Sequence, residues 1–378
     1  MRVLPMCVQP LLTWLVGKPL DGEARSKLTP WHHLASCLLA LAIGPAATAA
    51  ALARGGVATL AVLAGWILTV HGMRKLRTVI VHQCSHSNFT RNPRVDQPLG
   101  HLISFVLVTE SFAEYRITHP GDHHSARHQT LADPTVAFLI HEMGLRAGEP
   151  SRRSWIKLLR TLVSPRYHAA LASARLRSQW RTGSAARRAA LLAYIAANFG
   201  LAVAWWPWAL MWILPATVFF QMSTALRLSS RHFFPAKAPR SGADHVGRRF
   251  THGIFLGDPA PAGISPWTAR GLVAWTAWAA RMVGVHLPAR LLVLVGDGPC
   301  HDLHHDQPRH PDWANYPFVR AEAVIQPGKG HPPFTEVWGL VAAIQVCFET
   351  LERADPGDYD PATPVCSSAL DRLLAIED

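Results

Sequence analysis

The sequence predicts an all-α membrane protein with two transmembrane hairpins, giving four spans, and a cytoplasmic helical cap that holds a histidine-rich dimetal site. Three observations predict this fold class. The 378 residues are 49% hydrophobic and only 16% charged. Four long runs contain no Asp, Glu, Lys or Arg, and about 20 apolar residues suffice to cross the hydrocarbon core. Three short histidine clusters lie outside those uncharged runs.

The first hairpin is predicted at residues 34–53 and 57–81, joined by a tight turn at Arg54-Gly55-Gly56. The second is predicted at 189–206 and 207–228, with Trp205-Trp206-Pro207-Trp208 at the far membrane interface, where Trp is enriched. Only Arg54 lies in the short outer turns, whereas the opposite ends of the spans are rich in Arg and Lys. The positive-inside rule then places both termini and every histidine cluster in the cytoplasm.

Residues 82–188 and 229–378 are predicted to form the cap, so that residues 1–378 make one domain. Within the cap, residues 99–109 are too short to cross a membrane and suit an interfacial or re-entrant segment. Residues 141–188 are basic and amphipathic, as in an interfacial helix that rests on anionic headgroups or in a solvated linker. Residues 272–295 are apolar but contain Arg281, Pro288 and Arg290, so we expect two short helices and no further span.

The formal charge of +12 is explained by basic loops beside the spans, so a nucleic-acid partner is not needed. The six cysteines are scattered and form no Cys-x-x-Cys pair, which indicates reduced thiols rather than a disulfide framework. Composition and charge together therefore favour an integral membrane protein.

Each histidine cluster has the spacing of neighbours on one helical face, so we expect each to aim its imidazoles at one point. Eight imidazoles from three segments are enough to hold two metal ions. Imidazole suits Fe, Zn, Cu and Ni alike, so the residues alone leave the metal open. The clusters are His82 and His86; His119, His123 and His124; and His301, His304 and His305.

These clusters resemble the three histidine boxes of the membrane-bound fatty acid desaturase and hydroxylase superfamily. The forms H-x(3–4)-H, H-x(2–3)-H-H and H/Q-x(2–3)-H-H match in order, and the two hairpins match as well. Many members have a further ligand just after the fourth membrane helix, where His232 stands, although Arg231 replaces the Glu that often precedes it. His128 and His252 are weaker candidates. The resemblance implies nine metal ligands: His82, His86, His119, His123, His124, His232, His301, His304 and His305.

The resemblance also implies the chemistry. Two non-haem Fe ions would use O2 as co-substrate to oxidise an unactivated C–H bond of an acyl chain, as in a fatty acid desaturase. A hydroxylase or an oxidative decarboxylase of the same superfamily is the alternative. The substrate would be an acyl-lipid, an acyl-CoA or an acyl-carrier protein. Electrons would come from a separate protein of ferredoxin or cytochrome b5 type.

Carboxylates near the boxes are candidates for the groups that orient and polarise the ligands. Asp122, Asp302 and Asp306 lie inside or beside the boxes, and Asp133 follows the second box. We therefore predict outer-sphere roles in catalysis for Asp122, Asp302 and Asp306, with Asp133 as a further candidate.

Two other functions stay open on the residues alone. A membrane carrier of metal or haem could use the histidines for transport, but it should place ionisable residues inside its spans, and the uncharged runs have none. A zinc-dependent membrane hydrolase would act without O2 or reductant. The Glu-x-x-His pairs of ferritin-like proteins and the His-Glu-x-x-His motif of zincins do not occur.

Overall fold

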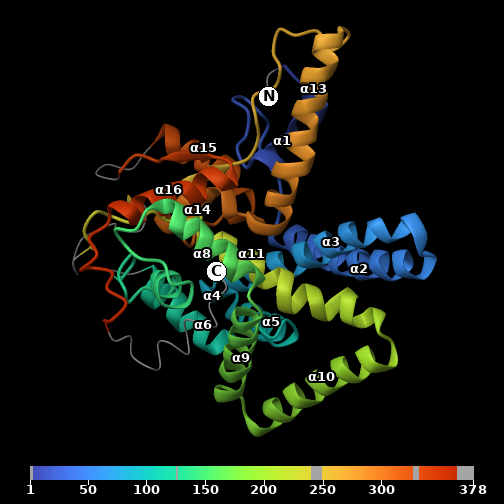
Figure 1. Cartoon of the computed structure of the whole chain (residues 1–378), viewed down its shortest axis with the longest axis vertical. Helices are drawn as coiled ribbons and strands as arrows, with labels where there is room; N and C mark the ends of the chain where they lie inside the picture. Colours follow the sequence, from blue (N-terminus) through green and yellow to red (C-terminus); the bar gives the residue numbers. More distant parts are fainter. Residues whose placement is uncertain (1–2, 125–126, 240–248, 327–331, 364–378) are drawn as a thin grey trace.

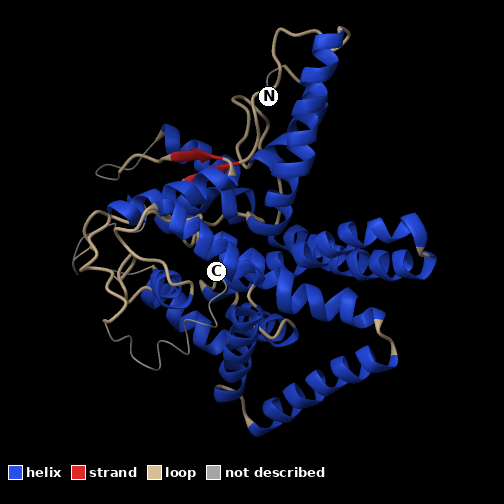
Figure 2. Ribbon diagram, viewed as in Figure 1, coloured by secondary structure: helices blue, strands red, loops and turns tan. Residues whose placement is uncertain are grey.

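Nearly all the regular structure of the chain is helical. The computed structural model describes residues 3–124, 127–239, 249–326 and 332–363. Figure 2 shows helices throughout and one small sheet. Its strands, β1 (Gly253–Phe255) and β2 (Glu336–Trp338), run parallel with Ile254 opposite Val337. The predicted helical class is confirmed.

The first predicted hairpin is present. Gly55 and Gly56, both with positive φ, make the expected turn. The two helices approach so closely that a Cβ atom on Gly44 would lie only 2.8 Å from the carbonyl oxygen of Gly65, so only glycine fits there. The returning helix continues past the hairpin without a break and carries the first histidine pair at its end. The first helix of the hairpin is α2 (Pro30–Arg54). The returning helix consists of η2 (Gly56–Leu60), α3 (Ala61–Lys75), η3 (Leu76–Val81) and α4 (His82–Ser85).

The second predicted hairpin also forms two long helices. The chain turns between them at Trp205-Trp206-Pro207, as expected, because proline cannot continue the first helix. The returning helix includes two π-helical segments and ends shortly before His232. The segments are α10 (Ala185–Ala204), η6 (Ala209–Ile213), η7 (Pro215–Phe219) and α11 (Phe220–Leu228).

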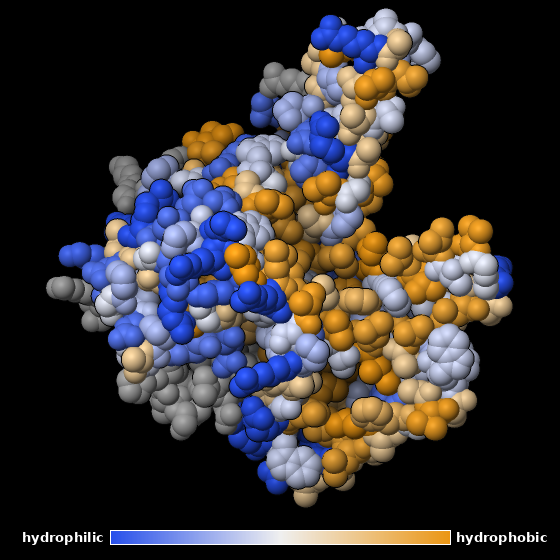
Figure 3. All heavy atoms as spheres, viewed as in Figure 1, coloured by the Kyte–Doolittle hydropathy of each residue, from blue (hydrophilic) through white to orange (hydrophobic). Residues whose placement is uncertain are grey.

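Within the described part of the chain, three helices are long and apolar enough to cross a membrane: Pro30–Arg54, Gly56–Ser85 and Ala209–Leu228. Helix α10 is of similar length but is not among them, and it carries Arg187 and Arg188 in its first turn. Figure 1 shows the α2–α3 hairpin and the helices of the second hairpin projecting from one side of the body. Their visible surface is largely hydrophobic, whereas the visible body is largely hydrophilic (Figure 3). The chain is an integral membrane protein.

The prediction of two short helices at residues 272–295 is wrong. One helix runs from Ala269 to Val293 and then bends by 77° into the segment Gly298–Asp306; this bent pair could add a membrane crossing. Pro288 lies inside the helix, where π-helical turns accommodate a break in the regular hydrogen-bond pattern. The segments are α13 (Ala269–Arg281), η8 (Met282–His286) and η9 (Ala289–Val293).

Arg281 and Arg290, which were expected to interrupt this segment, both have polar partners. Arg281 pairs with Asp258 at 2.7 Å, and the buried Arg290 donates to the carbonyl oxygen of Trp14 at 2.7 Å. These two charges therefore did not interrupt the helix, because both reach partners outside it.

The basic region 141–188 forms two helices whose apolar sides pack on protein. Leu158 of α8 is fully buried in a core shared with Phe348 of α16, and Trp155 donates to Gln345 at 2.6 Å. The helical prediction is confirmed, and the structure gives α8 a protein partner on its buried side. The helices involved are α8 (Ser151–Val163), α9 (Pro165–Arg181) and α16 (Leu340–Arg353).

Short helices complete the body around the histidines. In chain order they are η1 (Met6–Val8), α1 (Gln9–Val16), α5 (Pro93–Val106), α6 (Phe112–Thr118), η4 (His119–His123), α7 (Pro134–Ala137), η5 (Phe138–Glu142), η10 (Gly298–Cys300), α14 (His301–Asp306), η11 (Trp313–Asn315) and α15 (Tyr316–Ile325).

Candidate metal centre

Five histidines from three segments form the first cluster, in which the candidate ligand atoms all lie within 4.8 Å of one another. The Nε2 atom of His119 is 2.7 Å from that of His82 and 3.1 Å from that of His124. The Nε2 atom of His304 is 3.1 Å from that of His124. The members are His82, His86, His119, His124 and His304.

Four histidines form the second cluster under the same distance limit: His123, His232, His301 and His305. The Nε2 atom of His301 lies 3.0 Å from that of His305 and 3.3 Å from that of His232. His232 follows α11 and is fixed by a β-bridge to Thr251. All nine predicted histidines therefore lie in two adjacent groups.

The structural clusters are not the sequence boxes, so the expectation that each box aims at one point is wrong for two of them. Only His82 and His86 stay together, four residues apart on a continuous helix. The second box divides because η4 is π-helical: His124 bonds back to the His119 carbonyl oxygen, five residues earlier, at 3.2 Å. That wide turn brings His119 and His124 together and leaves His123 to the other cluster.

The third box divides as well. On α14, His301 and His305 are one helical turn apart and join the second cluster, while His304 projects to the first. Each of these two boxes therefore contributes to both clusters and links them.

The nitrogen spacing fits metal ligation. Histidine nitrogens bind metal ions such as Zn²⁺ at about 2.0–2.1 Å, so the nitrogen atoms of two neighbouring ligands of one ion lie roughly 3 Å apart. The observed Nε2 separations of 2.7–3.3 Å match this value. Burial, together with His128, His123 and Arg231, holds the pKa of His232 well below its ordinary value, so this ring stays neutral and can offer a lone pair. The residues fit two metal ions.

Asp133 is the carboxylate that contacts the second cluster. Its two oxygens lie 3.2 Å from Nδ1 of His123 and 3.1 Å from Nδ1 of His128. Burial opposes ionisation of this carboxyl, but His123 and His128 outweigh it and lower its pKa below the ordinary value. Backbone amides of Gln129 and Thr135 also donate to it, at 3.0 and 2.9 Å. Such a carboxylate–histidine pair fixes the ring and its tautomer.

His128 is the residue whose importance sequence reasoning underestimated. It is fully buried, and its ring centroid lies 4.7 Å from that of His232, 4.8 Å from that of His305 and 5.0 Å from that of His123. With Nδ1 directed to Asp133, its buried Nε2 has no hydrogen-bond partner within the described part of the chain. Its spacing of four residues from His124 was the available signal.

The structure describes the side chains of two predicted carboxylates, Asp302 and Asp306. Asp302 is buried and accepts from the guanidinium of Arg320 at 2.6 Å and from the amide of Leu303 at 2.8 Å, so it ties α14 to α15. Asp306 is the half-buried last residue of α14. The backbone of Asp122 lies in η4, and its side chain is outside the described residues.

His252 belongs to neither cluster. Its Nε2 atom is 2.9 Å from the carbonyl oxygen of Ser230, and its ring stacks on Phe233, so it supports the loop that carries His232.

Comparison with known families agrees with this site. The model of the family described as "Fatty acid desaturase" matches residues 57–338, which include both clusters and most of the apolar helices. A search of curated proteins finds no match to the chain. The chain therefore belongs to the fatty acid desaturase family.

Proposed function

We propose that this protein is a non-haem di-iron, O2-dependent fatty acid desaturase that oxidises an unactivated C–H bond of an acyl chain. The family makes it a membrane oxidoreductase with a lipid substrate and a metal requirement. The observation that supports a di-iron site is the pair of adjacent all-histidine clusters, whose nitrogen atoms are spaced as the ligands of one metal ion would be.

The first cluster would hold one ion, and the second cluster, with His128, would hold the other. Bound iron would supply the redox chemistry with O2, which side chains lack. The chain's residues position and protect it: Asp133 orients the rings of His123 and His128 through their Nδ1 atoms, and most of the ligands are buried, which limits water. Asp122 and Asp306 remain proposed as outer-sphere groups, and Asp302 would act by fixing α14.

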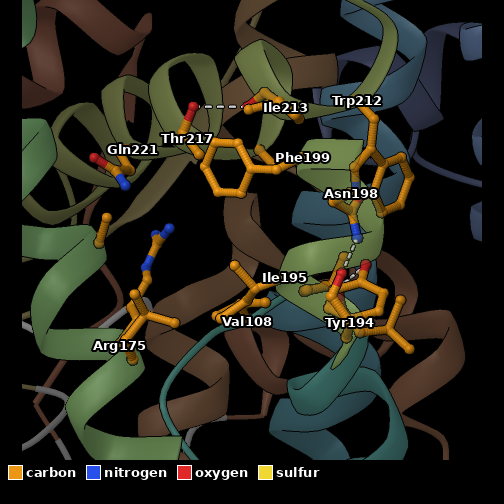
Figure 4. A pocket seen from close by; sticks show the side chains of 15 residues that line it. Val108, Arg175, Tyr194, Ile195, Asn198, Phe199, Trp212, Ile213, Thr217 and Gln221 are labelled. Atoms are coloured by element: carbon orange, nitrogen blue, oxygen red, sulfur yellow. Dashed lines mark hydrogen bonds between the residues drawn. The ribbon is translucent and has the colours of Figure 1, made fainter. Parts of the chain in front are cut away.

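An apolar cavity of about 230 Å³ is a candidate for part of the acyl-chain site. It lies among α5, α9, α10 and the helix that ends as α11, and Figure 4 shows Phe199, Ile195 and Val108 between its two sides. Arg175 and Gln221 lie on one side, and Tyr194 and Trp212 on the other (Figure 4). Apolar walls with a few polar groups suit a single long-chain ligand.

We also propose an orientation of the protein in the membrane. Four spans, with α10 as the third, would place both termini and the cap of a single domain in the cytoplasm. Because electrons must then come from that side, a separate cytoplasmic donor of ferredoxin or cytochrome b5 type would reduce the iron. The acyl group would arrive as a lipid, a CoA ester or a carrier-protein ester.

The test is metal content of the purified protein in detergent together with product analysis. We expect about two irons per chain, and O2 consumption that depends on a reductant and yields an acyl chain with a new double bond. An acyl chain with a new hydroxyl group would replace desaturation with hydroxylation. Zinc as the sole bound metal, with activity that needs no O2, would overturn the redox function.

A further inference from the structure

A second cavity, of about 500 Å³, lies where the α2–α3 hairpin meets the body. It is enclosed by α1, the start of α2, the end of α3, η9 and α15. Its walls are largely apolar but include several polar groups: Glu23, His33, Ser36, Lys75, Arg290 and Tyr316.

Two buried cations line this cavity. Lys75 is 8% exposed, and its Nζ donates to the hydroxyl of Ser36 at 2.6 Å. Arg290 is 2% exposed and donates to backbone carbonyl oxygens of Trp14 and Leu294. Among the described residues, no carboxylate lies within ion-pair distance of either cation. Buried charges are costly without an opposite charge, so the cavity is suited to an anion.

The other titratable wall residues are compatible with this reading. The Glu23 carboxylate accepts from the hydroxyl of Thr13 at 2.5 Å and from the amide of Leu20 at 3.0 Å, so it is engaged by α1 and its own loop. The Nε2 atom of His33 is 2.9 Å from the carbonyl oxygen of Ala314. Its Nδ1 is buried and has no hydrogen-bond partner in the described ranges. Because Nε2 must donate to that carbonyl oxygen, Nδ1 of the neutral ring is an acceptor, so His33 gives an anion no hydrogen bond and the two cations provide the positive charge.

The position of the cavity indicates what kind of anion fits. It lies at the end of an apolar hairpin, the depth at which a membrane amphiphile keeps its polar head. Tyr316 lines this cavity and also a smaller one lined by His304 of the first cluster. Tyr316 therefore borders both the cavity of the two cations and the one that reaches the first cluster.

We propose that this cavity binds the anionic head of an acyl amphiphile, namely the carboxylate of the substrate, with Lys75 and Arg290 as its counter-ions. This inference rests on the proposed function and changes it in one respect, because the acyl group would enter as a free acid rather than as a lipid, CoA or carrier-protein ester. The phosphate of a membrane lipid offers the same charge on an apolar chain, and the experiment separates these two sources.

The test is equilibrium binding to the purified full-length protein in phosphatidylcholine nanodiscs, with hexadecanoate and hexadecanol as probes of equal chain length. We expect the acid to bind at least about tenfold more tightly than the alcohol, as for one charge-assisted contact. Lys75→Met should remove most of this preference and Lys75→Arg should retain it. Lys157→Met is the matched control, because it removes a cation of α8 that is already paired with Glu149. It should leave the preference for the acid unchanged.

Equal binding of acid and alcohol, or a preference that survives Lys75→Met, would overturn the proposal. If Lys75→Met does not fold, Lys75→Gln keeps a donor for Ser36 and removes the charge. Lys75-dependent binding of dioleoyl phosphatidic acid without binding of hexadecanoate would overturn the substrate assignment and give the site to a lipid. Binding is measured without turnover, so it can be tested even if the purified protein contains no iron. Absence of iron would contradict the proposed function but would not change the outcome of the binding test.

Discussion

The two histidine clusters are built by different means. The first begins on a long continuous helix, whose last turns present His82 and His86 on one face. The second has no such platform. It gathers His123 from a π-helical turn, His232 from a loop after α11, and His301 and His305 from a six-residue helix, and Asp133 supports it from outside. We infer that the first centre is fixed by helix geometry and the second by polar contacts.

The largest expected effect comes from removing a ligand that only one cluster uses. His304→Ala should abolish activity and lower the metal content from about two ions to about one, because the second cluster keeps all its histidines. Iron analysis and Mössbauer spectroscopy would measure this. Loss of both ions would show that the clusters do not bind independently, and His301→Ala is the matched variant for the other centre.

Asp133→Asn should weaken the second ion selectively. Loss of an outer-sphere carboxylate typically costs about 10–100-fold in metal affinity. Titration against a competing chelator should show this loss for one ion while the other keeps its affinity. Equal weakening of both ions would contradict the difference between the clusters.

Asp302→Asn should act on the fold rather than on the metal. Breaking a buried ion pair costs about 3–5 kcal/mol, so the variant should unfold at lower temperature than the parent. We expect its metal affinity, measured on folded protein, to stay close to that of the parent. An affinity loss as large as that of Asp133→Asn would restore the role predicted for Asp302 from the sequence.

His128→Asn should have a smaller effect than loss of a boxed histidine, because four histidines of the second cluster remain. We expect a weaker second ion and a changed Mössbauer signal at one site, with the first site unaltered. A spectrum identical to that of the parent would remove His128 from the coordination sphere.

Arg54→Asp should have the smallest effect. Arg54 is an exposed residue at the far end of the first hairpin, and the basic residues that set orientation lie at the other end. Cysteine-accessibility mapping should find the same topology in the variant and the parent. An inverted first hairpin would show that this single charge controls insertion.

Features that depend on short stretches of the chain could be predicted from the sequence. The first hairpin, its glycine turn and the turn at Trp205–Pro207 follow from local rules, because uncharged length and turn residues act within a few positions. Eight of the nine histidines were also recognisable by spacing, whereas His232 followed only from the resemblance to the family. Residues 272–295 were misread because Arg281 and Arg290 find partners, Asp258 and Trp14, that are distant in the chain.

By itself, then, the sequence determined the helical membrane class, the spans of the first hairpin and the set of boxed histidines, since hydropathy and helical spacing are properties of short stretches. The tertiary structure alone decided how those histidines divide. A π-helical turn at His119–His123 and the approach of α14 exchange members between boxes, and packing brings Asp133 and His128 to the second cluster while pairing Asp302 with Arg320. Those outcomes depend on contacts between distant segments, which no local pattern encodes.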